Sequence, residues 1–301
     1  MTNNQRYHIP VLLHAAIQGL NISPEGIYVD VTYGGGGHSS EILNKLSSGK
    51  LFAFDQDSDA VANCVNDDKL TIIHQNFRYL KNFLRAEGVK QVDGILADLG
   101  VSSHQFDTGE RGFSIRFDGP LDMRMDKQSS LTAAKVLNTY EEADLKSIFK
   151  KYGELPNAGR VAWQIVKKRE EKPFKTTDQL KAALDALGGK QINSFMARVF
   201  QALRIEVNGE MEVLQDFLQQ TVEILRPGGR LVVISYHSLE DRLVKNFIKH
   251  GNFEGESVKD FYGNPIKPFA EISRKPITPD DDEISKNPRA RSAKMRIAEK
   301  L

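Results

Sequence analysis

Four consecutive glycines, Gly34 to Gly37, follow an apolar segment that includes Asp30, and the next apolar run ends at Asp55. A glycine turn between a strand and a helix lets the backbone approach a ligand, and the first turn of that helix presents unpaired N–H groups. A carboxylate at the tip of the second strand can accept hydrogen bonds from both hydroxyls of a ribose. These residues predict a site for a nucleoside.

The spacing of the glycines indicates which nucleoside is bound. The dinucleotide fingerprint needs a third glycine three residues after the second, and the two registers available here place Ser39 or Ser40 at that position. The arrangement of Asp30 with Gly34 and Gly36 is instead similar to the first motif of S-adenosylmethionine-dependent methyltransferases. A nicotinamide or flavin enzyme and a glycine turn without a ligand are the alternatives.

Alternating strand and helix patterns surround these residues. Such alternation predicts parallel strands joined by right-handed crossovers, with ligands beyond the carboxyl ends of the strands. Two of those ends add candidates, because Phe77 can pack on an adenine face and Asp98 can contact an amino group of the cofactor or of a substrate. The predicted strands are 27–33, 50–55, 70–77 and 92–99, and the predicted helices between them are 38–46, 59–65 and 79–87.

The pattern changes to mainly helical between residues 107 and 200 and then returns to alternation. Thr139-x-x-Glu142 and Thr176-x-x-Gln179 predict capping boxes, and 157–172 predicts a basic helix. An apolar stripe over 213–225 then precedes a buried strand at 230–236. We therefore predict an α/β fold, a Rossmann-like doubly wound sheet formed by residues 1–106 and 201–301, with an inserted helical domain at 107–200.

Composition narrows the class of protein. The 301 residues carry a net charge of +1, and Cys64 is the only cysteine, which excludes an intrachain disulfide and a zinc cluster of cysteines. The histidines show no metal-ligand spacing, so we expect no metal site. We find neither a membrane-spanning run nor a signal peptide, and we expect a cytoplasmic protein without membrane contact. Basic residues gather in 145–175 and in 286–300, where they either bind a phosphate backbone or form solvated faces.

Two histidines and a tyrosine have positions suited to catalysis. His38 is expected in the first turn of a helix, where a capping role is as plausible as a chemical one. His237, in Ser235-Tyr-His-Ser238 at the end of the late strand, is the better candidate for contact with a substrate, together with Tyr236. A hydrogen-bonded structural role is the alternative for His237.

Seven motifs together resemble the MraW family of bacterial 16S ribosomal RNA cytosine-N4 methyltransferases. They occur in the order of that family between about residues 7 and 297, which makes chance agreement implausible. The resemblance implies a class I methyltransferase fold, S-adenosyl-L-methionine as cofactor and 16S rRNA of the small ribosomal subunit as partner; a homodimer is compatible with it. The motifs are His8-x-Pro-Val-Leu-Leu13, Gly35-Gly-Gly-His-Ser39, Asp98-Leu-Gly-Val-Ser-Ser103, Arg111-Gly-Phe-Ser114, Gly119-Pro-Leu-Asp-Met-Arg-Met-Asp126, Ser235-Tyr-His-Ser-Leu-Glu-Asp-Arg242 and Asn287-Pro-Arg-Ala-Arg-Ser-Ala-Lys-Met-Arg296.

Asp98 is the first candidate for catalysis, since a hydrogen-bond acceptor can stabilise the positive charge that develops on a reacting amine, with His237 and Tyr236 behind it. The resemblance implies residues that bind the cofactor. Many amino methyltransferases carry Asn, Asp or Ser before Pro-Pro-Tyr, a motif absent after Asp98, so their catalytic assignment does not transfer. A non-catalytic ribosome-binding factor is the rival interpretation. The predicted cofactor-binding residues are Gly34, Gly36, Gly37, His38, Asp55, Phe77, Asp98 and Gln105.

Overall fold

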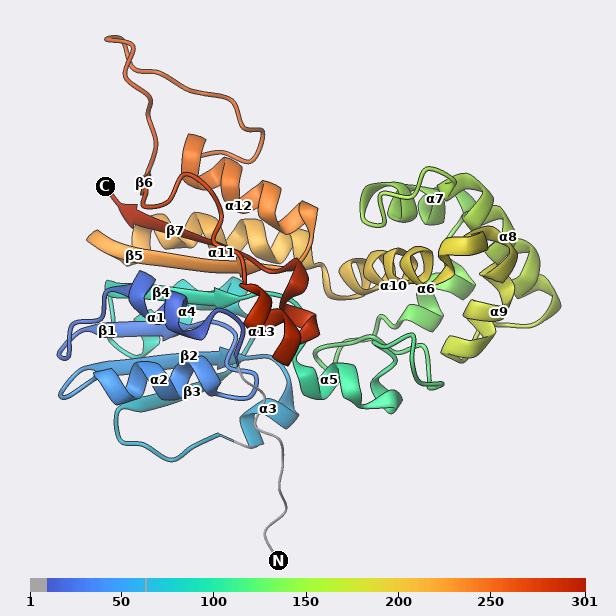
Figure 1. Ribbon diagram of the computed structural model, residues 1–301, viewed down its shortest axis with the longest axis horizontal. Coiled ribbons are helices and arrows are strands. Elements are labelled where there is room, and N and C mark those ends of the chain that lie inside the picture. The colour runs from blue at the N-terminus through green and yellow to red at the C-terminus, as the bar shows by residue number, and fades with distance from the viewer. Residues whose placement is uncertain (1–9, 63) are drawn as a thin grey trace, which may run out of the picture. The chain divides into compact units, whose positions relative to one another are not determined.

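The computed structural model describes residues 10–62 and 64–301 (Figure 1). The chain forms two compact units, Met1–Gly100 with Glu212–Leu301 and Val101–Met211. The second unit thus starts before the predicted limit of 107 and ends after the predicted limit of 200. Among the described residues, every helix is too short or too polar to cross a membrane.

The first unit is built on a seven-stranded sheet of order β3-β2-β1-β4-β5-β7-β6. Strands β3, β2, β1, β4 and β5 are parallel, and β7 runs antiparallel to both of its neighbours. This is the doubly wound α/β sheet that the sequence predicts, with a reversed strand added at one side. The strands are β1 Ile27–Asp30, β2 Lys50–Asp55, β3 Leu70–His74, β4 Val92–Asp98, β5 Leu225–Ser235, β6 Phe269–Glu271 and β7 Lys294–Lys300.

Helices cover both faces of the sheet, which explains why its central strands are apolar along their whole length. Ile95 of β4 faces the core formed with α4, α11 and α12, whereas its neighbour Leu96 faces the core formed with α1 and α2. Both side chains are fully buried. The helices of this unit are α1 Leu13–Leu20, α2 Gly37–Lys45, α3 Ser58–Ala62, α4 Leu80–Ala86, α11 Glu210–Ile224, α12 Ser238–His250 and α13 Asp281–Lys286.

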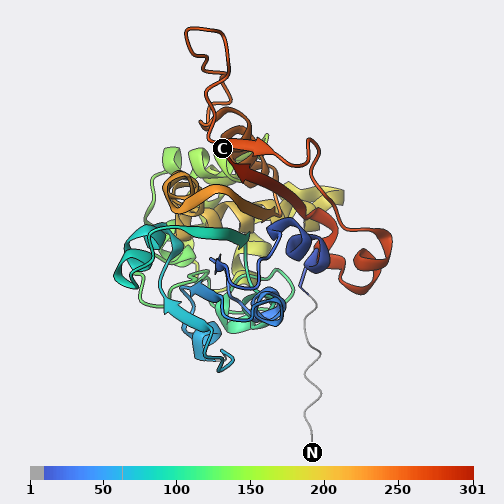
Figure 2. The same ribbon diagram turned by 90° about the vertical axis from the view of Figure 1, so that its left-hand side faces the viewer.

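Figures 1 and 2 show that the segment between α12 and β6 extends away from the sheet. An isolated bridge between Lys259 and Pro265 closes its far end. Phe261 and Tyr262 lie at that end, 98% and 85% exposed. The sequence analysis did not single out this segment.

The second unit is helical, as predicted. Amphipathic spacing buries one stripe of each long helix, for example Val161, Ala162 and Ile165 of α8. The capping box at Thr176 is confirmed, since its hydroxyl accepts the Gln179 N–H at 3.4 Å and Gln179 Oε1 accepts the Thr176 N–H at 3.3 Å. The helices are α5 Ser103–Asp107, α6 Ala133–Thr139, α7 Glu142–Lys151, α8 Ala158–Glu171, α9 Thr177–Gly188 and α10 Ile192–Asn208.

Two local predictions are wrong. Thr139 does not open a capping box, because it is the last residue of α6 and its hydroxyl donates to the carbonyl of Lys135 at 2.8 Å. The strand predicted at 230–236 begins at Leu225, since β5 follows α11 directly and includes Pro227. A register shift against β4 between Val92 and Gly94 accommodates the extra residues.

The basic residues of α8 fall into two groups. Arg169 Nη1 donates to the carbonyls of Leu137 (3.0 Å) and Tyr140 (2.5 Å) at the end of α6, where unpaired carbonyls favour a cation. Arg160 and Lys167, by contrast, are exposed. The fold therefore uses Arg169 and leaves Arg160 and Lys167 at the surface.

Replacing Arg169 should destabilise the protein. Arg169→Gln removes hydrogen bonds from a charged donor, which are worth about 1.5–3 kcal/mol, whereas Arg160→Gln should change stability by less than about 0.5 kcal/mol. Calorimetric melting of both variants checks this expectation. Equal melting temperatures for the two would show that Arg169 does not join α6 to α8.

Candidate functional site

The glycine turn between β1 and α2 adopts a conformation that favours glycine. Gly34 and Gly36 have φ of 51° and 72°. A Cβ on Gly36 would lie 2.6 Å from the Tyr33 hydroxyl, and a Cβ on Gly37 would lie 2.2 Å from Cγ of Pro10, whereas Gly35 meets open space. The turn is therefore packed on one side and open at Gly35, as a backbone cradle for a ligand requires.

Asp55 at the end of β2 is tied to this turn. Its Oδ2 accepts the Gly34 N–H at 2.8 Å, and its Oδ1 accepts the Asp57 N–H at 2.8 Å. The pKa of Asp55 is raised to about 6. Burial is the main cause, the charges of Asp57 and Asp30 also raise it, and the two backbone hydrogen bonds lower it. The carboxylate thus stands beside the turn with its negative charge only partly compensated.

Asp98 at the end of β4 is the second acidic group with a raised pKa. Its Oδ1 accepts the hydroxyl of Tyr236 at 2.8 Å, its Oδ2 lies 3.7 Å from Nδ1 of His38, and its side chain is 23% exposed. Burial raises the pKa of Asp98 to about 6, opposed by His38 and by the Tyr236 hydrogen bond, while Asp30 and Glu240 repel its charge. A cation placed beside Asp98 would relieve this repulsion.

Tyr236 holds the Asp98 carboxylate in place. Burial, and then the charge of Asp98, raise the pKa of the Tyr236 hydroxyl well above its ordinary value. The hydroxyl therefore keeps its proton at neutral pH and donates a hydrogen bond to Asp98. The Asp98 N–H is fixed in turn, because it donates to Thr32 Oγ1 at 2.7 Å.

His38 joins Asp98 to the start of the described chain. Its Nε2 lies 3.1 Å from the carbonyl of Val11, and since a carbonyl only accepts, Nε2 carries the proton. Nδ1 then faces Asp98, as an acceptor in the neutral ring or as a donor in the cation. His8, the first residue of the motif that includes Val11, lies outside the described residues.

Asp30 has a structural role. It is 1% exposed, and its Oδ2 accepts the Ser39 hydroxyl at 2.7 Å, while its Oδ1 accepts the Thr32 N–H at 3.1 Å. These bonds join the end of β1 to the first turn of α2. Asp30 therefore fixes the glycine turn and adds negative charge behind Asp55 and Asp98.

His237 has a capping role in the structure. It is the N-cap of α12, with Nδ1 accepting the Glu240 N–H at 3.4 Å and Nε2 lying 3.2 Å from Glu240 Oε1. Glu240 Oε2 in turn accepts the N–H of His237 at 3.3 Å, which closes the reciprocal box, and the N–H of Tyr236 at 2.8 Å. The box gives His237 a structural role, and its contact with a substrate stays a prediction.

Phe77 and Gln105 each have a structural partner as well. Phe77 follows β3 and places its ring edge against Phe217, with centroids 5.3 Å apart. Gln105 belongs to the second unit, where its Oε1 accepts the Ser102 N–H at 3.1 Å in the capping box of α5. Their roles in cofactor binding stay predictions.

The first unit therefore brings together Asp55, Asp98, Tyr236, His38 and the glycine turn, all near the carboxyl ends of parallel strands. Sequence reasoning missed three supporting groups. Thr32 and Glu240 hold the backbone of Asp98 and Tyr236, and Glu283 of α13 accepts the Leu12 N–H at 2.7 Å. Nothing in the sequence signals these pairings, which join residues up to 271 positions apart.

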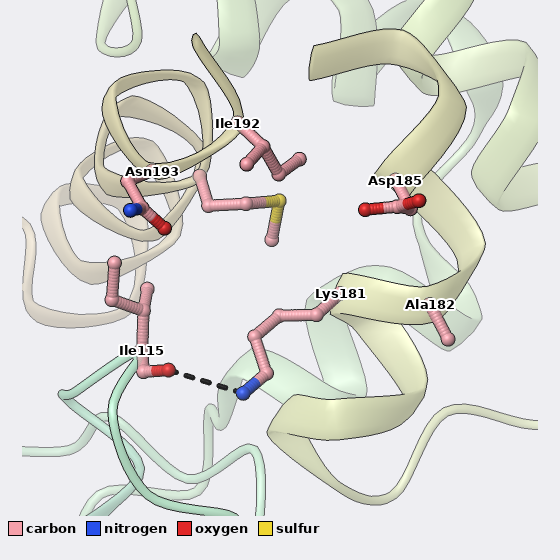
Figure 3. A pocket seen from close by; sticks show the side chains of 7 residues that line it. Ile115, Lys181, Ala182, Asp185, Ile192 and Asn193 are labelled. Carbon is pink, nitrogen blue, oxygen red and sulfur yellow. Dashed lines mark hydrogen bonds between the residues drawn. The ribbon is translucent and has the colours of Figure 1, made fainter. Parts of the chain in front are cut away.

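The second unit has a hollow of about 470 Å³ between α9 and α10 (Figure 3). Its walls include Ile115, Ile192 and Met196, with Asp185 and Asn193 as polar groups. Lys181 crosses it and donates to the carbonyl of Ile115 at 3.0 Å. Because this lysine is also paired with Asp178 at 2.5 Å, the hollow offers no acid–base arrangement like that around Asp98.

Comparison with known proteins gives a consistent result. The model of the MraW methylase family matches residues 5–301. Proteins named ribosomal RNA small subunit methyltransferase H are 61% identical in Flavobacterium johnsoniae, over 100% of both chains, and 57% identical in Cytophaga hutchinsonii, over 98% of this chain and 99% of the relative. A solved rRNA methylase from Streptococcus thermophilus is 12% identical, with a TM-score of 0.44 over 98% of this chain and 99% of that one.

The raised pKa of Asp98 predicts a pH-dependent cost in stability. Because the native pKa of about 6 lies above the ordinary 3.8, the native state binds more protons between these values, and stability falls as pH rises through that window. Asp98→Asn removes this cost and should stabilise the protein by about 1–3 kcal/mol at pH 7.5, a gain reduced by the weaker hydrogen bond from Tyr236. At pH 4 we expect no stabilisation. Calorimetric melting at both pH values checks this. A variant that is less stable at pH 7.5 would contradict it.

Proposed function

Because the chain belongs to the MraW methylase family, we propose that it is the methyltransferase that carries a methyl group from S-adenosylmethionine to the exocyclic N4 amine of a cytidine in 16S rRNA. The observation that carries the chemical part of this proposal is the Asp98 carboxylate at the end of β4, held by Tyr236 and repelled by the charges of Asp30 at the end of β1 and Glu240 in α12.

The residues of the site fit this cofactor. Bound S-adenosylmethionine supplies a methyl group on a cationic sulfur. The open backbone at Gly35 and the first turn of α2 would receive its polar groups, and Asp55 would accept its ribose hydroxyls. The only partly compensated negative charge at Asp55 and Asp98 suits a ligand of net positive charge.

Asp98 has the right chemistry to assist the acceptor amine. The N4 lone pair of cytosine is delocalised into the ring, so the amine gains nucleophilicity when an acceptor draws on its N–H. As the N–CH₃ bond forms and the C–S bond breaks, positive charge develops on N4, and the Asp98 carboxylate stabilises it. With a pKa of about 6, Asp98 can then take the N4 proton and release it to solvent.

Tyr236 acts as a positioning residue in this scheme, and His237 supports it from a distance. The Tyr236 hydroxyl donates to Oδ1 of Asp98 and so fixes the orientation of the carboxylate, whose Oδ2 lies 3.7 Å from His38 Nδ1. The capping box of His237 and Glu240 fixes the backbone of Tyr236. Such fixed dipoles need little reorganisation during the reaction.

We also propose that the second unit, Val101–Met211, recognises the RNA. The exposed cations of α7 and α8 support this, since they suit a phosphate backbone. We propose the small ribosomal subunit as partner and the cytoplasm as the location, where ribosomal subunits are assembled. The question of a homodimer is open to measurement of the mass in solution.

Labelled cofactor tests the function directly. We expect incubation with methyl-labelled S-adenosylmethionine and small subunits from cells lacking this protein to label 16S rRNA, and nuclease digestion to yield labelled N4-methylcytidine. Label in another nucleoside would refute the N4 assignment. Binding to subunits without any labelled nucleoside would favour a non-catalytic ribosome-binding factor.

Loss of the Asp55 carboxylate should weaken cofactor binding. Hydrogen bonds to a charged acceptor are worth about 1.5–3 kcal/mol, so Asp55→Ala should lower the affinity roughly ten- to hundredfold. Isothermal calorimetry of the wild type and of Asp55→Ala measures this loss. An unchanged affinity of Asp55→Ala would remove Asp55 from the site.

Kinetics of Asp98→Asn separate the two roles that Asp98 can play. A role limited to the transition state lowers the single-turnover rate at saturating cofactor, while a role in binding appears mainly in the affinity. We expect the rate to fall by about 10²-fold or more, and Tyr236→Phe, which keeps the ring and removes the donor, to give a smaller loss. Wild-type methyl transfer by Asp98→Asn would exclude a catalytic role.

A further inference from the structure

The side chain of Trp163 lies half in solvent on the basic helix α8. It is 49% exposed, whereas its helical neighbours Val161, Ala162 and Ile165 are buried in the core of the second unit. The ring therefore points away from the packed side of α8. An aromatic ring of this size left in water is available to a partner.

Cations surround Trp163. Lys167, one turn later, places Nζ 5.0 Å from the centre of the ring, and Arg160, about one turn earlier, is exposed on the same face. Lys146 of α7 crosses beside them, because its Cδ and Cε lie 3.7 Å from the position where Gly159 would carry a Cβ.

None of these three cations forms an ion pair with any residue that the structure describes. Lys168, in contrast, pairs with Glu171 at 2.9 Å, and Arg169 caps α6. The side of α8 around Trp163 therefore combines one exposed aromatic ring with positive charge that the fold does not neutralise.

We propose that Trp163 is a stacking platform for an unpaired base of the RNA substrate, with Lys146, Arg160 and Lys167 contacting the adjoining phosphates. This inference rests on the proposed RNA substrate and adds to it a defined contact. Single-stranded segments are bound by aromatic rings that stack on bases inside a basic surface. An acidic protein segment would match the charge but would not need the flat face of the ring.

The chain carries its own probe for this contact, because Trp163 is its only tryptophan. We expect a short oligoadenylate to quench the tryptophan fluorescence of the full-length protein as it binds. Trp163→Ala should weaken RNA binding roughly five- to hundredfold, and Trp163→Phe, which keeps a ring for stacking, should retain most of the affinity. Arg160→Gln and Lys167→Gln should each lower the slope of log affinity against log salt by about one.

A matched control lies on the first unit. Tyr79 is 46% exposed, with the Arg78 guanidinium 5.9 Å from its ring centre. It reproduces the exposure of Trp163 and a cation near the ring, but this cation is paired with Asp216. Tyr79→Ala should leave the affinity for oligoadenylate unchanged.

Methyl transfer to small subunits keeps this inference separate from the proposed function. If Trp163 stacks on the substrate, Trp163→Ala raises the KM for RNA and leaves cofactor affinity at the wild-type value. If saturating RNA does not quench the fluorescence of the wild type and Trp163→Ala binds RNA with full affinity, the stacking site is refuted. Methyl transfer by the same wild-type protein would still support the proposed function. Loss of activity on assembled subunits alone, with oligoadenylate binding intact, would assign Trp163 to a ribosomal protein and also overturn the proposal. A wild-type protein that methylates no RNA would refute the function itself.

Discussion

Acidic side chains crowd together where the parallel strands of the first unit end, and the rest of the site depends on this crowding. Parallel pairing brings Asp30, Asp55 and Asp98 to the carboxyl ends of three neighbouring strands, and burial raises the pKa of Asp55 and of Asp98. Both carboxylate oxygens of Asp30 accept hydrogen bonds from neighbouring residues. Asp55 and Asp98 also accept hydrogen bonds, but their pKa values are raised. The structure thereby stores an attraction for a cationic ligand at the cost of some stability, as functional sites often do.

Sequence reasoning predicted the parts of this site that depend on local pattern. Strand ends that carry an acidic residue or a glycine turn can be predicted from the hydrophobic periodicity and the residue types alone, and β1, β2 and β4 begin where the sequence predicts them. Contacts between residues far apart in the sequence could not be predicted in this way. The bond from Leu12 to Glu283 and the pairing of β7 with β5 depend on tertiary packing. The fold uses His237 as a helix cap, which is the structural alternative that the sequence left open, and its contact with a substrate stays a prediction.

The second unit shows how a basic segment divides between fold and surface. A count of charges over 145–175 treats its cations as equal, yet Arg169 is bound to α6 while Lys146, Arg160 and Lys167 are free of ion pairs within the described chain. Only the structure separates the two groups, because the carbonyls that Arg169 contacts come from the end of α6, 32 and 29 residues earlier in the chain. The exposed group surrounds the one tryptophan of the chain.

Burial raises the pKa of the Asp98 carboxyl, and we propose that the cationic cofactor binds beside this group. The number of protons released on binding shows whether it does. At pH 6, where Asp98 is about half protonated in the free protein, S-adenosylmethionine should favour the ionised form and expel about half a proton from this residue. Calorimetry in buffers of different ionisation enthalpy measures that number. We expect Asp98→Asn to release about half a proton less than the wild type when the cofactor binds. Equal proton release by the two proteins would show that the cofactor does not bind beside Asp98.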